Sequence, residues 1–112
     1  MRRGEIWWTS LADPAGSGPG FRRPVLVMQS NDFNESSIGT TIGVALTSNL
    51  RLAQAPGNCR LRPKDSGLRR DSVVNVSQLI TVDKRLLTSL VARVSAGTLR
   101  NVEAGIRLVL AL

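Results

Sequence analysis

The stretch Gly20-Phe21-Arg22-Arg23-Pro24-Val25-Leu26-Val27-Met28 indicates how this chain folds. Residues 24–29 are almost continuously apolar, which is typical of a buried strand, and proline is tolerated as the first residue of a strand. Residues 13–20, just before, are rich in Gly and Pro and predict a flexible loop over about 13–22. Two arginines therefore stand where a flexible loop meets a rigid strand.

Outward from this strand, further short segments have the composition of strands. Residues 5–10 and 39–47 are aromatic or β-branched, and around Cys59 and Leu61 apolar residues alternate with arginines. Residues 72–80 continue the pattern, and residues 86–94 are predicted to be extended, although they would tolerate a short helix. The intervening segments, 30–37, 48–58 and 63–67, are predicted to be turns and connections.

Near the C-terminus, the apolar residues follow the spacing of a helix instead of the alternation of a strand. Ser95 is a suitable N-cap, and the apolar residues after it fall at helical spacing: Leu99, Val102, Ile106, Val109 and Leu110. This predicts an amphipathic helix over about 95–112 that packs on the core rather than on a partner. Many short strands and one closing helix predict a single, mainly β domain over 1–112, a small curled barrel with the helix packed on it.

The charge balance points to an anionic partner. The chain has 15 Lys and Arg against 8 Asp and Glu, a net charge of +7, and all the basic residues except Lys64 and Lys84 are arginine. A basic surface attracts nucleic acid, an anionic membrane or an acidic protein. Because guanidinium is a planar fork that matches phosphate oxygens, the arginine bias favours phosphate, although it is also compatible with a simple gain in solubility.

The composition also excludes several classes of site. The chain has no histidine and a single cysteine, Cys59, so an internal disulfide or a site with several cysteine ligands is excluded, and the usual zinc and copper ligands are missing. We therefore expect no metal and no cofactor, with Cys59 a half-buried strand residue. No apolar run is long enough to span a membrane and no signal peptide precedes the first strand, so we expect a cytoplasmic protein.

Five blocks, in order, carry a resemblance to the MazF/PemK-like toxin family. They are Arg3-Gly4-Glu5-Ile6-Trp7-Trp8, Gly16-Ser17 followed by Arg23-Pro24-Val25-Leu26-Val27, Val44-Ala45-Leu46-Thr47-Ser48-Asn49, Arg70-Asp71-Ser72-Val73-Val74, and residues 78–86. The resemblance implies an SH3-like β-barrel with a C-terminal helix, acting as a homodimer. It also implies a growth-inhibiting endoribonuclease that cleaves single-stranded RNA at specific sequences without a metal, and an acidic, MazE-like antitoxin that covers the RNA groove.

In the family, the 2′-hydroxyl of the RNA attacks the adjacent phosphorus and leaves a 2′,3′-cyclic phosphate and a 5′-hydroxyl. Arg23 and Thr47 match the family's catalytic positions. Arg23 offers charge and parallel donors to the phosphorane oxygens, and Thr47 offers a hydroxyl donor at the end of a strand. The general base stays unassigned, because Gly18 replaces an acidic residue of many members, and Asn75 and Ser77 replace an Arg and Asp that others carry.

Further residues are candidates for contacts with RNA. Arg22 is either a second phosphate contact or a solvated charge, and Ser48 and Asn49 either touch the RNA or only form a turn. Among the aromatics, Phe21 is the preferred base-stacking candidate. One of Trp7 and Trp8 is expected in the core and the other outside it, because neighbours on a strand face opposite ways. The remaining candidates are Ser17, Ser77 and Gln78.

Two other functions stay open on sequence grounds. Toxins of the same fold bind DNA gyrase without nuclease activity, and a non-catalytic RNA-binding barrel would share the basic surface. The RNA sequence that is cleaved, the class of RNA and the identity of the antitoxin do not follow from these residues.

Overall fold

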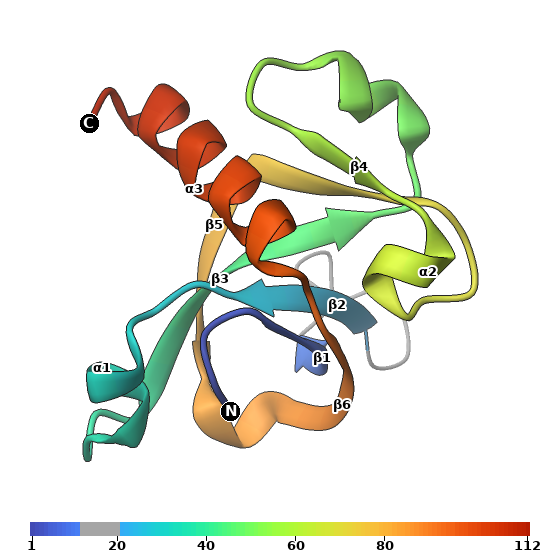
Figure 1. Cartoon of the computed structure of the whole chain (residues 1–112). Coiled ribbons are helices and arrows are strands. Elements are labelled where there is room, and N and C mark those ends of the chain that lie inside the picture. The colour runs from blue at the N-terminus through green and yellow to red at the C-terminus, as the bar shows by residue number, and fades with distance from the viewer. Residues whose placement is uncertain (12–20) are drawn as a thin grey trace.

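The strands of this computed structural model, which describes residues 1–11 and 21–112, form one antiparallel sheet (Figure 1). Most of the loop predicted at 13–22 lies outside the described residues. The order across the sheet is β4-β5-β3-β2-β1-β6. The strands are β1 (Glu5–Leu11), β2 (Phe21–Val27), β3 (Thr40–Thr47), β4 (Cys59–Leu61), β5 (Ser72–Asp83) and β6 (Leu87–Arg93).

Short helical segments connect the strands, and one longer helix ends the chain. The connections hold α1 (Asn31–Glu35), α2 (Pro63–Ser66) and two 3-10 turns, η1 (Leu50–Gln54) and η2 (Lys84–Leu86); the final helix is α3 (Ala96–Leu110). The predicted fold class, mainly β with a C-terminal helix, is confirmed. The predicted turn at 30–37 contains α1, because the Ser30 side chain accepts a hydrogen bond from the Phe33 amide and caps that helix.

The sheet curls so that its two outer strands approach one another near α2. Gly67, in the left-handed conformation (φ +77°), ends α2, and a Cβ built on it would lie 2.8 Å from the Cβ of Ala92 on β6. Since α2 directly follows β4, this close contact links the β4 edge to the β6 edge. The result is a partly closed barrel rather than a flat sheet.

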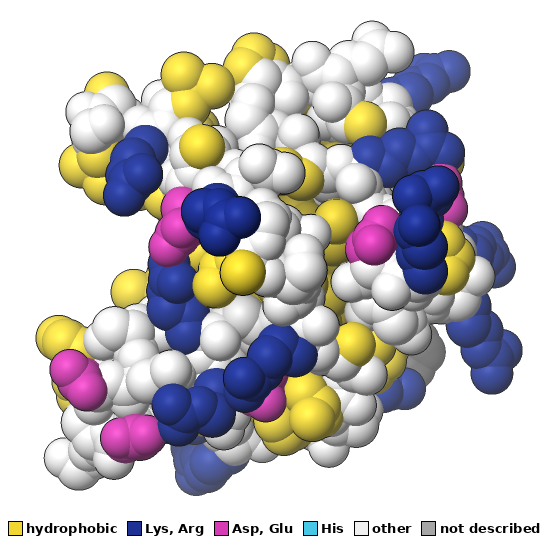
Figure 2. Space-filling view, in the orientation of Figure 1, with side chains coloured by type: hydrophobic (Ala, Val, Ile, Leu, Met, Phe, Trp, Pro, Cys, Tyr) yellow, Lys and Arg dark blue, Asp and Glu magenta, His cyan; other side chains and the backbone are white. Residues whose placement is uncertain are grey.

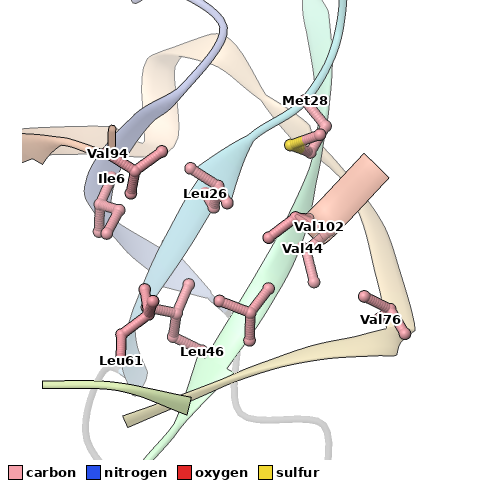
Figure 3. Packing of buried hydrophobic residues seen from close by; sticks show 10 residues of the cluster. Ile6, Leu26, Met28, Val44, Leu46, Leu61, Val76, Val94 and Val102 are labelled. Atoms are coloured by element: carbon pink, nitrogen blue, oxygen red, sulfur yellow. The ribbon is translucent and has the colours of Figure 1, made fainter. Parts of the chain in front are cut away.

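The core lies between α3 and one face of the curled sheet (Figure 3). Leu26, Val44 and Val102 are fully buried there, and they come from β2, β3 and α3. The other members of this cluster are Ile6, Met28, Leu46, Leu61, Val74, Val76 and Val94. Ser95 caps α3 as predicted, because its Oγ accepts a hydrogen bond from the Thr98 amide at 3.1 Å.

Two expectations about apolar side chains were wrong. Neither Trp7 nor Trp8 enters the core; both are half-buried, and Ile6 is the buried residue of this part of β1. The pairing of β1 with β6 shifts register on both sides of the Trp7-Trp8 pair. Such irregularities disturb the alternation of inward and outward side chains, so neither tryptophan points fully into the core. On α3, Val109 and Leu110 are 42% and 51% exposed, because the helix extends past the edge of the core.

Helix α3 packs very closely against the backbone of Gly57 at Gly105. A Cβ built on this glycine would overlap the carbonyl oxygen of Gly57, and it would also lie 3.1 Å from a methyl group of Val76. The backbone at Gly57 cannot easily move, because Gly57 itself has φ +85° and its own added Cβ would touch Gly105. The absence of a side chain at position 105 therefore sets how closely α3 packs.

We expect Gly105→Ala to lower the free energy of unfolding by about 1–3 kcal/mol, because it overpacks this contact. The matched control is Gly97→Ala on the same helix, where the nearest atoms lie 3.9 Å from an added Cβ. That change should leave stability unchanged or raise it by up to about 1 kcal/mol. Urea denaturation measures both; equal effects of the two substitutions would contradict the packing argument.

Candidate functional site

Strands β2 and β3 separate at Pro24. Their ladder pairs Val25 with Ala45, Leu26 with Val44 and Val27 with Gly43, and it goes no further. Proline has no N–H to donate, so Pro24 cannot continue this ladder. Beyond it, β2 pairs with β1, while the end of β3 pairs with β5. The prediction that Pro24 would begin the strand was wrong, since β2 begins at Phe21.

The separation places Arg23 and Thr47 opposite one another. Continuing the register of Val25 with Ala45 by two residues along each strand pairs Arg23 with Thr47. Residues that face each other in an antiparallel pair project from the same face of the sheet. The two predicted catalytic side chains thus stand on the two sides of one gap in the sheet.

A pocket of about 570 Å³ opens at this gap. Trp8 from β1 and Val91 from β6 contribute to its walls, together with residues from β2, from the end of β3 and from the segment between α2 and β5. These are Arg22, Arg23, Pro24, Leu46, Thr47, Ser48, Gly67, Leu68, Arg69, Arg70, Asp71 and Ser72. The structure therefore brings four predicted site residues together: Arg22, Arg23, Thr47 and Ser48.

The pocket carries a net positive charge. Its described lining holds four arginines and one carboxylate, that of Asp71. Arg60 binds this carboxylate through Nε at 3.1 Å and Nη2 at 2.6 Å, both to Oδ2. The one carboxylate of the described lining is thus already bound by an arginine from outside the pocket, and an anion is the ligand that the net charge favours. Figure 2 shows the same excess of Lys and Arg over Asp and Glu on one face of the molecule.

Arg22 is held against the wall of the pocket by an aromatic ring. Its guanidinium carbon lies 4.8 Å from the ring centroid of Trp8, a cation–π distance. The neighbouring Trp7 instead donates its indole N–H to Glu5 Oε1 at 3.1 Å. Burial raises the pKa of Glu5, but the hydrogen bonds from Trp7 and the Arg2 amide outweigh this and lower it, so Trp7 lies beside an ionised carboxylate.

Thr47 keeps its hydroxyl proton available. The Thr47 oxygen accepts a hydrogen bond from the Asn49 amide at 3.1 Å, while its own hydrogen is donated to no other described residue. This arrangement fixes the hydroxyl and leaves it as a donor toward the pocket. The Asn49 side chain accepts from the Arg51 amide and caps η1, and Asn49 does not line the pocket.

Two further predicted residues, Ser77 and Gln78, are not brought to this pocket. Ser77 and Gln78 are exposed on β5, in a bulged segment, since β5 pairs with Leu46 at Val74 and with Val44 only at Leu79. Ser77 Oγ donates to Asn75 Oδ1 at 2.8 Å. Ser17 and the side chain of Phe21 lie outside the described residues.

Sequence reasoning missed Arg69 and Arg70 as part of the site. The signal that could have found them is the one that singled out Arg22 and Arg23, namely two adjacent arginines shortly before an apolar strand. Residues 1–11 and 21–112 contain no group of three or more His, Cys, Asp or Glu side chains that could hold a metal ion. Cys59 is half-buried as predicted, and burial raises the pKa of its thiol.

Comparison with known proteins gives concordant matches over the whole chain. The model of the family described as "PemK-like, MazF-like toxin of type II toxin-antitoxin system" matches residues 2–110. Endoribonuclease MazF6 of Mycobacterium tuberculosis is 46% identical over 112 residues, covering 100% of this chain and 98% of the relative. Endoribonuclease EndoA of Bacillus subtilis is 32% identical, covering 100% and 96%.

Solved structures share the fold. A crystal structure of MazE-MazF from Deinococcus radiodurans superposes with a TM-score of 0.82 at 22% identity, covering 100% of this chain and 96% of that one. A mycobacterial endoribonuclease in complex with its cognate antitoxin gives a TM-score of 0.80, also at 22% identity and with the same coverage. Within the described part of the chain, no helix has the length and apolarity needed to cross a membrane.

The two tryptophans should respond differently to a soluble anion. Iodide quenches indole fluorescence on collision, and we expect it to quench Trp8, beside Arg22, about twofold or more strongly than Trp7, beside Glu5. The variants Trp7→Phe and Trp8→Phe isolate each emission. Adding Arg22→Gln to Trp7→Phe should lower the quenching of Trp8. Equal quenching constants for the two tryptophans would contradict the charge distribution described above.

Proposed function

The chain belongs to the family of PemK-like, MazF-like toxins of type II toxin–antitoxin systems, and we propose that it is a growth-inhibiting endoribonuclease that cleaves single-stranded RNA. The observation that carries the site assignment is the position of Arg23 and Thr47 across the gap between β2 and β3, in one positively charged pocket. We also propose a cytoplasmic location.

We propose that the reaction needs no metal and uses the RNA's own 2′-hydroxyl. The 2′-oxygen loses its proton and forms a bond to the adjacent phosphorus, while the bond from phosphorus to the 5′-oxygen breaks. The leaving 5′-oxygen takes up a proton, so the products are a 2′,3′-cyclic phosphate and a 5′-hydroxyl. Negative charge accumulates on the non-bridging oxygens in the transition state, which is where donors are most effective.

Arg23 and Thr47 are the catalytic residues in this proposal. The guanidinium of Arg23 supplies a permanent positive charge and parallel N–H donors, and the hydroxyl of Thr47 supplies one further donor from a fixed position. Asp71 is the only carboxylate among the described lining residues, and it is bound by Arg60. These residues therefore contribute mainly by stabilising charge rather than by carboxylate-assisted proton transfer.

Arg22 and Ser48 extend the same surface and are proposed to contact the RNA beside the scissile phosphate. Phe21, Ser17, Asn49, Ser77 and Gln78 remain proposed contacts, with Ser77 and Gln78 reaching only RNA that extends beyond the pocket. Because RNA and an acidic antitoxin would both be attracted to the same arginines, we propose that a MazE-like antitoxin inhibits by competing for this pocket.

We also propose that the protein acts as a homodimer. Leu108, Leu110 and Leu112 at the end of α3 are 60%, 51% and 83% exposed, and they offer apolar surface for such a contact. Light scattering after size exclusion tests this assembly independently of activity.

The enzyme activity is tested by incubating the protein with a long RNA of known sequence in EDTA and mapping the 5′ ends. We expect cuts at a defined sequence, each with a 5′-hydroxyl, in wild-type protein. Arg23→Lys keeps the charge but loses the planar fork, so cleavage should fall by about 100-fold or more. Wild-type rates in this variant would overturn the role of Arg23, and binding without any strand scission would instead indicate a non-catalytic RNA-binding barrel.

Thr47→Val removes the hydroxyl while keeping the shape of the side chain. We expect kcat to fall by about 100-fold, with a much smaller change in KM, because the lost donor acts on charge that develops in the transition state. Thr47→Ser is the matched control and should keep most of the activity. A loss in Thr47→Ser as large as that in Thr47→Val would show that the methyl group, and not the hydroxyl, is what matters.

A further inference from the structure

The pocket has a second basic wall, which comes from a different part of the chain than the wall formed by β2. Arg69 and Arg70 line it from the segment between α2 and β5, whereas Arg22 and Arg23 line it from β2. Both side chains are exposed, and neither makes a hydrogen bond or ion pair with another described residue. They are thus charged donors that face a cavity and are not used to hold the fold.

The segment that carries these arginines is fixed at both ends. On the α2 side, Gly67 packs against Val91 and Ala92 of β6, and the Leu68 amide donates to Ser66 Oγ at 3.0 Å. On the β5 side, Arg60 holds the carboxylate of Asp71. A guanidinium on such a short braced segment loses less conformational entropy when it binds than one on a free loop.

The Arg60–Asp71 pair also preserves the charge of this wall. Asp71 is the residue next to Arg70, and its carboxylate is bound by Arg60. Because Arg60 lies on β4 and does not line the pocket, it offsets the negative charge of Asp71 without occupying the cavity. The result is two uncompensated arginines in a pocket that already holds Arg22 and Arg23.

The size of the cavity points to a ligand larger than a single phosphate. A volume of about 570 Å³ is in the range of about 300–1,000 Å³ that accommodates small ligands. The lining of the cavity extends from Arg22 on β2 to Ser72 at the start of β5, so a ligand that fills it would touch both of these walls.

We propose that Arg69 and Arg70 form a second phosphate subsite, which binds the phosphodiester next to the one that is cleaved. This inference rests on the proposed endoribonuclease function and adds a positioning role for a wall that the catalytic assignment does not use. With Arg23 on the scissile phosphate and this wall on its neighbour, the RNA backbone is held at two points across the gap. Two such points set which phosphate lies between Arg23 and Thr47, independently of the bases.

The test uses a short RNA that contains the mapped cleavage sequence, and two copies in which a neutral methylphosphonate replaces the phosphate on the 5′ or the 3′ side of the scissile one. The enzymes are wild type, Arg69→Gln/Arg70→Gln, and Arg100→Gln/Arg107→Gln. The last variant loses the same charge from exposed positions of α3. Thermal midpoints confirm that all three are folded.

For wild type, we expect one of the two neutral linkages to lower kcat/KM by about tenfold or more, the usual effect of losing a charge-assisted contact. On unmodified RNA, kcat/KM of Arg69→Gln/Arg70→Gln should be lower than that of wild type by a similar factor. The neutral linkage that affects wild type should lower kcat/KM of this variant little further. The α3 variant should behave like wild type. Arg69→Lys/Arg70→Lys, which restores the charge, should regain sensitivity to the neutral linkage.

Three results would overturn the subsite. The first is an Arg69→Gln/Arg70→Gln enzyme that stays as sensitive to the neutral linkage as wild type. The second is an equal loss in the α3 variant, which would mean that overall charge alone is responsible. The third is a wild-type enzyme that cleaves no RNA, which would remove the proposed function and the subsite together; in the first two cases cleavage persists and only the subsite fails.

Discussion

The missing N–H of Pro24 is the constraint on which the site depends. A ladder between two antiparallel strands needs an N–H donor at alternate positions. Pro24 lacks this donor, and the pairing of β2 with β3 ends beside it, at Val25. Toward Phe21, β2 pairs with β1, and the end of β3 pairs with β5. A sheet that continued the ladder would fill this space with backbone. Its interruption opens a pocket whose opposite sides carry Arg23 and Thr47.

The pocket obtains its chemistry from side chains that stay charged at any physiological pH. In a chain without histidine, guanidinium groups supply both charge and directed donors. Arg22 and the segment with Arg69 and Arg70 are positioned by different contacts. Arg22 lies over the ring of Trp8, and the segment with Arg69 and Arg70 is braced by Gly67 and by the Arg60–Asp71 pair. Preorganised donors of this kind cost little reorganisation when a phosphate binds.

Much of the fold could be predicted from local patterns, and the departures have physical causes. The apolar run 24–29 and the helical spacing after Ser95 predicted a buried strand and α3, because burial and N-capping are read from neighbouring residues. Burial of one tryptophan was not predicted correctly, since the register shifts of β1 against β6 depend on strands about 80 residues apart. The exposure of Val109 and Leu110 at the end of α3 likewise depends on where the sheet ends, and the spacing of apolar residues within the helix does not predict this.

By itself, the sequence predicted the fold class, because residue chemistry and period are local properties, and its family resemblance singled out Arg23 and Thr47 as the candidate catalytic pair. Tertiary structure alone decided that Arg22, Arg23, Thr47 and Ser48 share one pocket while Ser77 and Gln78 lie outside it. It also added Arg69 and Arg70, which are about 46 residues away from Arg23 in the chain. Such proximity follows from strand order and register, and these are set by long-range backbone pairing.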